Sequence, residues 1–269
     1  ARIYGVDSKG KIWGKLYSFS STGRTANNWT ETNGIMSITS QTYYRDPNVL
    51  QSTTYDRDGY SYMHSSGLGE TRYEMLAQEL EQNYYEIIES IKKYGGFYIG
   101  RYELSNEGVQ KEKATLTNKN WYELYKKCTT LNASDKVESK MIWGIQWDLA
   151  CDFISKKGEQ KSITDSTAWG NYSNSTGNAA VMDGETKKYG SKQVTGYSEY
   201  WKANNIYDLA GNCWEWTQEA RSTNLRAYRG GYYNCNGSFD PATSRDYSDP
   251  TLTNPYSNYG SRPTLYLIP

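Results

Sequence analysis

Apolar side chains recur every three or four residues in the segment before Gly95, which is the spacing of one face of an α-helix. The segment ends with Lys92 and Lys93, followed by Gly95-Gly96, as is typical of a helix C-terminus. The sequence therefore predicts an amphipathic helix over residues 75–94, whose inner face consists of Met75, Leu76, Leu80, Tyr84, Ile87, Ile88 and Ile91.

Further along, the pattern predicts a strand over residues 97–103 and helices over 121–131 and 145–154. The inner face of the last helix is predicted to consist of Trp147, Ala150, Cys151 and Ile154. Residues 155–200 are polar and rich in glycine, and are predicted to be mostly loop. From Asn205 onward, short β-like pieces alternate with glycine, proline and asparagine. Residues 1–70 are expected to wrap as loops and short strands around a single α+β domain that spans 1–269, since no repeat or flexible linker divides the chain.

The charge balance excludes several classes of partner. The chain has 30 basic and 30 acidic residues, so no overall field favours nucleic acid or an anionic membrane. With a mean hydropathy of −0.87, the sequence contains no run near the ~18 apolar residues of a membrane span. The 269 residues contain no signal segment, and we expect a soluble chain without membrane contact of its own that acts outside the cell, on a cell surface or on a virion.

The aromatic residues are unusual in kind: 27 Tyr and 9 Trp against only 4 Phe. Tyrosine suits surfaces that are half wet, because its hydroxyl needs a partner when buried. This composition fits either an ordinary Tyr/Ser/Thr/Asn-rich extracellular protein or a recognition surface.

Cysteine and histidine offer little catalytic chemistry. Cys128, Cys151, Cys213 and Cys235 have no metal-type spacing, and they neither demand nor exclude disulfides. His64 is the one histidine in the chain. Zinc catalysis and Ser-His-Asp chemistry would both depend on it, which argues against either.

Three strings carry a family resemblance: GGFYIGRYE (95–103), NIYDLAGNCWEWT (205–217) and RAYRGG (226–231). In this order they resemble the C-type lectin-like domain of the formylglycine-generating enzymes, also called sulfatase-modifying factors. A weaker match is IWGIQWD (142–148). The resemblance covers about residues 95–269 and implies an α+β fold of short twisted antiparallel strands, a few helices and much irregular loop.

The resemblance also implies a calcium site in the second string. Asp208 and Glu215 would supply carboxylates, while Gly211 and Cys213 would supply backbone carbonyls, and such oxygen ligands suit Ca²⁺. The alternative is structural: Asp208 caps a turn and Glu215 pairs with a core arginine. No organic cofactor is expected.

The enzymes of this family bind copper through two cysteines just after the RGG motif. Here Cys235 occupies the first position, but the second is Asp240. One thiolate beside a carboxylate does not reproduce a two-thiolate copper site. Related iron-dependent enzymes of the family need several histidines. The sequence therefore argues against an enzyme, with a copper-dependent oxidase kept as an alternative.

The composition changes sharply near the C-terminus. Lys, Glu, Gln, Met and Trp supply more than a quarter of residues 1–219, but residues 220–269 contain none of them. The segment consists mostly of Tyr, Asn, Ser, Asp, Gly, Thr, Pro and Arg, close to the composition of an antibody paratope. Codons that end in a pyrimidine encode none of the five missing types. For example, randomising the first two bases of the asparagine codon AAC yields Tyr, Ser, Asp and Gly, but never Lys, Glu, Gln, Met or Trp.

This signature resembles the variable region of proteins diversified by bacterial or phage diversity-generating retroelements, which often use the same lectin-like fold. The resemblance implies a non-catalytic receptor or adhesin with an unknown protein or carbohydrate ligand. A constant carbohydrate-binding module with an ordinary Tyr/Ser-rich tail is the remaining alternative. We assign Arg229, Arg245 and Arg262 to the scaffold, and the predicted contact residues are Tyr232, Tyr233, Asn234, Cys235, Asp240, Asp246, Tyr247, Ser248, Asp249, Tyr256, Ser257, Asn258 and Tyr259.

Overall fold

The computed structural model describes strand residues between positions 2 and 44, helical positions from 83 to 94, and residues 95–268 except 132–133, 135, 223–224 and 251–255. The predicted boundary near residue 70, His64 and the predicted start of the first helix at Met75 lie outside the described residues.

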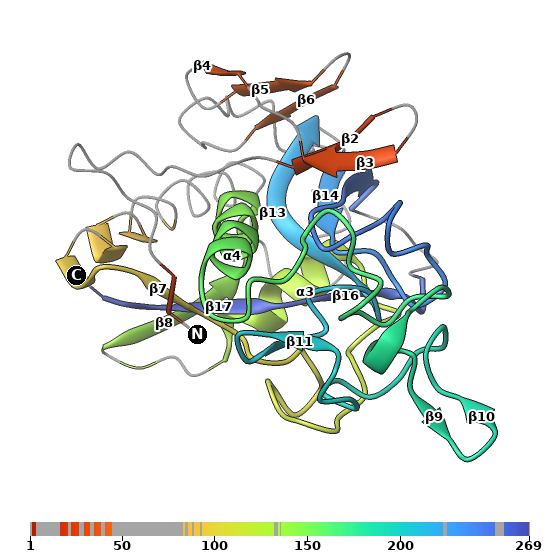
Figure 1. Ribbon diagram of the computed structural model, residues 1–269. Coiled ribbons are helices and arrows are strands. Elements are labelled where there is room, and N and C mark those ends of the chain that lie inside the picture. The colour runs from red at the N-terminus through yellow and green to blue at the C-terminus, as the bar shows by residue number, and fades with distance from the viewer. Residues whose placement is uncertain are drawn as a thin grey trace.

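The described elements are short and mostly strands (Figure 1). The helices whose bounds are described are α3 (Trp121–Thr129), α4 (Gly144–Lys156) and the 3₁₀ helix η3 (Gly177–Ala179). The strands are β1 (Arg2–Ile3), β2 (Tyr17–Ser20), β3 (Gly23–Ala26), β4 (Thr30–Thr32), β5 (Ile35–Ile38), β6 (Gln41–Tyr44), β7 (Phe97–Ile99), β8 (Val137–Met141), β9 (Met182–Asp183), β10 (Thr186–Lys187), β11 (Lys202–Ala203), β12 (Ile206–Tyr207), β13 (Trp214–Ser222), β14 (Leu225–Arg229), β15 (Arg245–Ser248), β16 (Tyr259–Ser261) and β17 (Pro263–Leu267).

Two sheets organise the molecule. One has the antiparallel order β1-β7-β17-β8, and the other has the order β15-β14-β13-β6-β5-β4. Strand β16 lies beside β13 in parallel, which the expectation of antiparallel strands did not include. In the sequence, residues 249–258 separate the end of β15 from the start of β16, so these two strands do not have to form a tight hairpin, which would make them antiparallel. The architecture is mixed α+β with small, mostly antiparallel sheets and few helices, and it is compatible with a C-type lectin-like fold.

The predicted first helix is helical at its described positions 83, 86–87, 89–91 and 93–94. The amide of Gly95 donates to the carbonyl of Ile91 at 2.7 Å, and Gly95 has a φ of 75°. Glycine adopts this left-handed conformation without the cost that other residues incur, so Gly95 ends the helix as predicted. Strand β7 follows but stops at Ile99, four residues before the predicted end.

Helix α3 begins at a capping box. The side chain of Asn120 accepts a hydrogen bond from the Glu123 amide, and the Glu123 carboxylate accepts one from the Asn120 amide, both at 3.0 Å. Trp121, Leu124 and Cys128 share its buried face. The helix ends at Thr129, two residues before the predicted end at Leu131.

Helix α4 extends the predicted 145–154 helix by one residue at its start and two at its end. Its predicted inner face of Trp147, Ala150, Cys151 and Ile154 is completely buried. The indole of Trp147 donates to the carbonyl of Ala242 at 2.8 Å, which ties the helix to the C-terminal segment.

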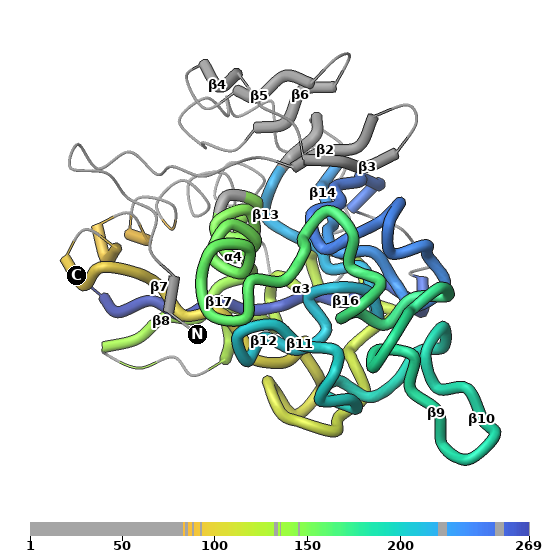
Figure 2. Tube along the Cα trace, viewed as in Figure 1, coloured from red at the N-terminus to blue at the C-terminus, as the bar shows by residue number. Residues whose placement is uncertain are grey.

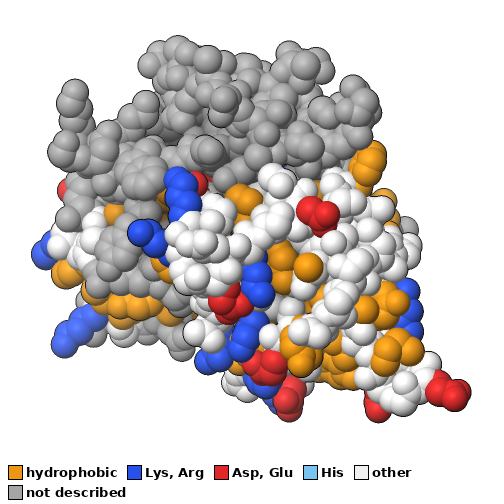
Figure 3. All heavy atoms as spheres, viewed as in Figure 1, with side chains coloured by type: hydrophobic (Ala, Val, Ile, Leu, Met, Phe, Trp, Pro, Cys, Tyr) orange, Lys and Arg blue, Asp and Glu red, His pale blue; other side chains and the backbone are white. Residues whose placement is uncertain are grey.

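Most of the described buried apolar residues form one cluster, whose members range from Ile87 to Tyr266. The tube in Figure 2 shows that residues 230–250, in blue, follow β14 along one side of this body. Within the described part of the chain, no helix is long and apolar enough to cross a membrane. On the face viewed in Figure 3, charged side chains of both signs lie next to each other below the middle of the molecule.

Candidate functional site

Strands β14, β15 and β16 of the C-terminal segment (residues 220–269) form one end of the larger sheet. The pairing register of these strands with β13 shows which of their side chains lie on the same side of the sheet. Directly paired residues point to the same side of a sheet. Tyr228 in β14 lies opposite both Trp216 in β13 and Asp246 in β15, and Trp214 lies opposite Tyr259 in β16. These five residues therefore share one side. Its centre is aromatic: the Tyr228 ring centroid is 4.9 Å from that of Trp214 and 5.2 Å from that of Trp216.

The other side of the same strands carries buried ion pairs to helix α4. Arg229 binds Asp148 at 2.7 Å, and Arg245 binds both Asp148 at 2.8 Å and Glu219 at 2.7 Å. All four side chains have zero exposure. Losing one partner of such a group leaves a buried charge uncompensated, so these contacts fix the segment to the scaffold.

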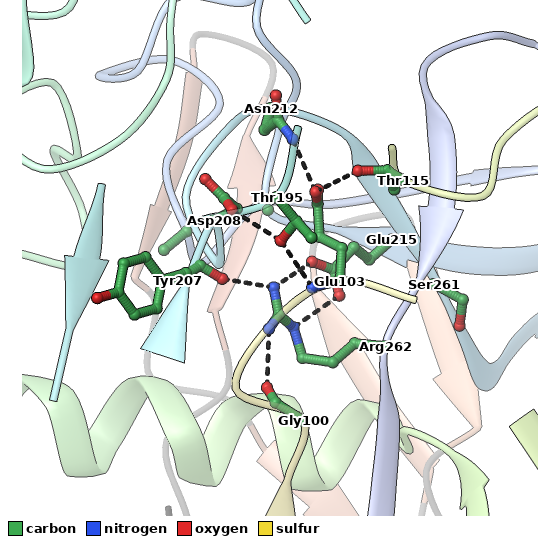
Figure 4. Close-up of polar contacts among 12 residues, drawn as sticks. Gly100, Glu103, Thr115, Thr195, Tyr207, Asp208, Asn212, Glu215, Ser261 and Arg262 are labelled. Atoms are coloured by element: carbon green, nitrogen blue, oxygen red, sulfur yellow. Dashed lines mark hydrogen bonds and ion pairs between the residues drawn. The ribbon is translucent and has the colours of Figure 1, made fainter. Parts of the chain in front are cut away.

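A third arginine of the segment sits in a second buried polar group (Figure 4). Arg262 donates to both carboxylate oxygens of Glu215, at 2.7 and 3.0 Å. It also donates to the carbonyls of Gly100 at 2.8 Å and Tyr207 at 2.7 Å. Arginine suits this position because its planar fork can meet a carboxylate and two carbonyls together. The assignment of the three arginines to the scaffold agrees with this geometry.

Glu103 and Asp208 complete that polar group without a cation of their own. One Glu103 oxygen accepts from Thr115 at 2.5 Å and from Asn212 at 2.7 Å. One Asp208 oxygen accepts from Thr195 at 2.9 Å and from the Gly196 amide at 2.7 Å. Burial raises the pKa of Asp208 to about 6. Burial, together with the nearby carboxylates of Asp208 and Glu215, raises the pKa of Glu103 well above its usual value.

The predicted calcium ligands Asp208, Gly211, Cys213 and Glu215 lie along this polar group. Arg262 occupies both oxygens of Glu215, and one oxygen of Asp208 is occupied as described above. This is the structural alternative that the sequence left open, with Glu215 paired to a core arginine. Across the described ranges, no three His, Cys, Asp or Glu side chains are placed to hold a metal ion. These carboxylates do not fit a calcium site as they are placed, and calcium stays a prediction that titration must test.

The thirteen predicted contact residues all reach the surface. None of them is buried, in contrast to the three arginines of the same segment. The exposed ones are Asn234, Asp249, Tyr256 and Ser257, and the half-buried ones are Tyr232, Tyr233, Cys235, Asp240, Asp246, Tyr247, Ser248, Asn258 and Tyr259.

These residues come from three stretches, 232–240, 246–249 and 256–259, which meet around Tyr259. Its ring centroid lies 4.7 Å from that of Tyr228 and 5.1 Å from that of Tyr256. Burial raises the pKa of Tyr259 to about 12, and Asp246, Tyr256 and Cys235 each add to the rise through their negative charge. One residue of each stretch is thus close enough to Tyr259 to act on its titration.

The stretch 232–240 is held by its backbone. The Tyr233 amide donates to the carbonyl of Asn212 at 3.1 Å, and the Cys235 carbonyl accepts from the Ser173 hydroxyl at 2.8 Å. The Gly237 amide donates to the side chain of Asn174 at 2.8 Å. Because these bonds use the backbone of 232–240, its side chains can differ without disturbing them. A loop fixed in this way loses less entropy on binding.

The loop 166–175 that supports this stretch was read from sequence only as polar connection. In the structure it packs beneath the C-terminal segment: the buried Tyr172 hydroxyl donates to the carbonyl of Gly230 at 2.7 Å, and the Asn171 backbone meets Gly211. Gly211 has a φ of 78°, and a side chain there would collide with Asn171. Trp169 and Tyr172 were the available signal, since large aromatic residues inside a polar stretch indicate contact with a core.

The four cysteines, all within the described residues, form no disulfide with one another. Cys128, Cys151 and Cys213 are buried, and burial raises the pKa of Cys128 and of Cys151 to about 12. Cys235 alone of the four is half-buried. Position 240, where the sequence resemblance would place a second copper-binding cysteine, is an aspartate.

The comparisons with known proteins find similar solved structures but no matching sequence family. No protein-family model and no curated protein matches the sequence. Among solved structures, the chain is similar to Treponema denticola variable protein 1, with 16% identity and a TM-score of 0.33 over 50% of this chain and 49% of that one. It thus spans about half the length of that protein. It is also similar to CarF, with 15% identity and a TM-score of 0.42 over 64% of this chain and 87% of that one.

Proposed function

We propose that this chain is a non-catalytic ligand-binding protein that displays residues 232–259 as a diversified Tyr/Asn/Ser/Asp-rich surface. In this proposal it serves as a receptor or adhesin outside the cell or on a virion, and a diversity-generating retroelement varies the segment. The domain would be a C-type lectin-like domain of the formylglycine-generating type, from which the catalytic cysteine pair has been lost.

One observation carries the proposal: the segment separates residues that hold the fold from residues that can vary. Arg229, Arg245 and Arg262 have zero exposure and bind carboxylates in α4 and β13. The thirteen predicted contact residues lie in the stretches between these arginines, and all of them reach solvent. A surface that changes by mutation needs this separation, because exposed positions usually shift stability by only about ±0.5 kcal/mol.

The missing residue types provide independent support. Fold stability does not require the absence of Lys, Glu and Gln from exposed positions, and they are common there. Their absence from residues 220–269 therefore indicates a constraint on the codons.

Sequencing the neighbouring DNA and the same gene in sister isolates tests the proposal. We expect a reverse transcriptase gene, a near-duplicate of the 3′ end of this gene, and differences at positions such as Tyr233 and Tyr256. Arg229, Arg245 and Arg262 should be unchanged in every isolate. Identical tails without a nearby reverse transcriptase would refute diversification and favour a constant carbohydrate-binding module.

The oxidase alternative has a separate test, which uses the purified chain. We expect no oxygen consumption above the background when copper and a cysteine-containing peptide are added. Restoring the family's second cysteine with Asp240→Cys provides the matched control, since it places a thiol where the catalytic members have one. Oxygen consumption by the parent chain would contradict the non-catalytic proposal.

A further inference from the structure

A tight turn over residues 236–239 lies in the C-terminal segment, and its residues were not among the thirteen predicted contacts. The Asn236 carbonyl accepts from the amides of Phe239 at 2.9 Å and Asp240 at 2.7 Å. The side-chain oxygen of Asn236 accepts from the amide and the hydroxyl of Ser238, at 3.0 and 2.7 Å. An asparagine that bonds to the backbone two residues on is a typical way to fix a turn. None of these bonds uses the side chain of Phe239.

Residues outside the segment hold this turn in place. The side-chain oxygen of Asn174 accepts from the Gly237 amide at 2.8 Å, and the Ser166 amide donates to the Gly237 carbonyl at 3.0 Å. Gly237 is buried, and a Cβ atom there would lie 2.6 Å from the ring of Tyr172, which is itself buried. Close-packed neighbours of this kind do not move aside cheaply, so position 237 has room only for glycine.

Phe239 is the large side chain that this turn carries into solvent. It is 52% exposed, whereas Phe97 is completely buried and Phe153 packs against the core. Phenylalanine has no hydroxyl to bond water, and burial of its ring against a partner is therefore favourable. A single exposed apolar residue is common on proteins. Phe239 differs because its turn is fixed from outside the segment and lies within the proposed binding surface.

The stretch 231–240 closes on itself, which places Phe239 on the same compact loop as several predicted contacts. A Cβ atom at Gly231 would collide with the Asp240 carbonyl, so the two ends of the stretch lie together. Tyr232 and Tyr233 follow one end and meet edge to face, with centroids 5.1 Å apart. Phe239 precedes the other end. The loop thus carries three aromatic rings, none of them buried.

We propose that Phe239 is a further contact residue of the binding surface and determines part of its specificity. The inference rests on the proposed binding function and adds a residue to it. Codons for phenylalanine end in a pyrimidine, so the residue belongs to the types that the diversification described above can produce. An aromatic ring on a preorganised turn is a strong anchor, because little conformational entropy is lost when it binds.

A random-peptide library selected on the purified chain tests this inference. Each retained peptide is titrated against the parent and the single variants Tyr233→Ser, Phe239→Ser and Tyr200→Ser. Tyr200 lies outside the segment and is 53% exposed, which makes it the matched control for Phe239. Most of the peptides that Tyr233→Ser weakens should also lose about tenfold or more in affinity with Phe239→Ser. They should bind Tyr200→Ser as they bind the parent.

Urea denaturation separates a contact residue from a residue of the fold. Phe239→Ser should leave the midpoint of unfolding close to that of the parent, because the ring is half exposed. Gly237→Ser should lower the midpoint clearly, because the added side chain meets Tyr172. A decrease for Phe239→Ser as large as that for Gly237→Ser would assign Phe239 to the fold and overturn the inference.

The binding outcomes distinguish the inference from the function on which it rests. Peptides that depend on Tyr233 but bind Phe239→Ser as tightly as the parent would overturn the inference and keep the binding surface. If neither Tyr233→Ser nor Phe239→Ser weakens any retained peptide, the proposed binding surface itself is refuted.

Discussion

Arg262 holds both carboxylate oxygens of Glu215, at 2.7 and 3.0 Å, and neither side chain has any exposure to solvent. The pair joins β13, which contains Glu215, to the single residue that separates β16 from β17. Replacing Arg262 with Met should reduce the free energy of unfolding by about 3–5 kcal/mol, because Glu215 loses its partner in the core. Urea denaturation measures this loss.

Two controls belong with that measurement. The double variant Arg262→Met with Glu215→Gln should recover part of the stability, since it removes the stranded carboxylate. Lys156→Met breaks the partly exposed pair with Asp152 and should cost no more than about 1 kcal/mol. Equal losses for Arg262→Met and Lys156→Met would contradict a structural role for the buried pair.

The tyrosines of the segment should differ sharply in their contribution to stability. Changing Tyr233 and Tyr256 to Ser should lower the unfolding free energy by about 0.5 kcal/mol each, because both reach solvent. Changing Tyr228 to Ser should cost about 3 kcal/mol or more, because its ring is buried against Trp214, Trp216 and Tyr259. Chemical denaturation of the three single variants decides this, and a large loss at Tyr256 would place the segment in the core.

Stability should decrease as the pH rises above about 4.5, because Glu103 and Asp208 have raised pKa values in the folded protein. In the unfolded chain these carboxyls lose their protons at lower pH, so the folded state binds more protons over this range and is favoured by acid. For Asp208 the loss should be complete above about pH 6, and for Glu103 it should continue to higher pH.

The free energy of unfolding, measured by urea denaturation at about pH 5, 6, 7 and 8, tests this prediction. Glu103→Gln keeps the size and an oxygen acceptor but removes the titrating group, so its stability should fall less with pH. The exposed Glu107→Gln should behave as the parent. If both variants show the parent's slope, the pKa of Glu103 is not raised in the folded protein.

Calcium binding is predicted by the resemblance, although Arg262 occupies Glu215 in this structure. If the prediction holds, millimolar calcium should raise the melting temperature of the parent more than magnesium does, since a ligand that binds only the folded state stabilises it. Asp208→Asn should remove the increase. Thermal scans with and without a chelator measure the effect, and an unchanged melting temperature in the parent would reject the site.

Only Cys235 should react quickly with a thiol reagent in the native protein, because the other three thiols are buried and burial raises their pKa. A disulfide-exchange assay should therefore titrate one thiol in buffer and four in denaturant. Cys235→Ser is the control, and it should abolish the native reaction. Fewer than four thiols in denaturant would reveal a disulfide.

The sequence determined those features that depend on nearby residues. The spacing of Trp147, Cys151 and Ile154 defined the buried face of α4, and Gly95 marked the end of the helix predicted over residues 75–94. Both could be predicted because periodicity and turn conformation are local properties. The composition of residues 220–269 likewise identified the segment expected to reach the surface, since the absence of Lys, Glu, Gln, Met and Trp is visible in a single chain.

Tertiary structure alone decided which distant groups meet. Nothing in the sequence indicated that Tyr172 would support Gly230, or that Asp148 would hold two arginines of the C-terminal segment. The two roles left open for Glu215 could not be separated either, because a buried carboxylate pairs with whichever cation the fold brings within reach. That choice depends on long-range packing, here the return of β16 and β17 beside β13 and β7, and no local pattern records it.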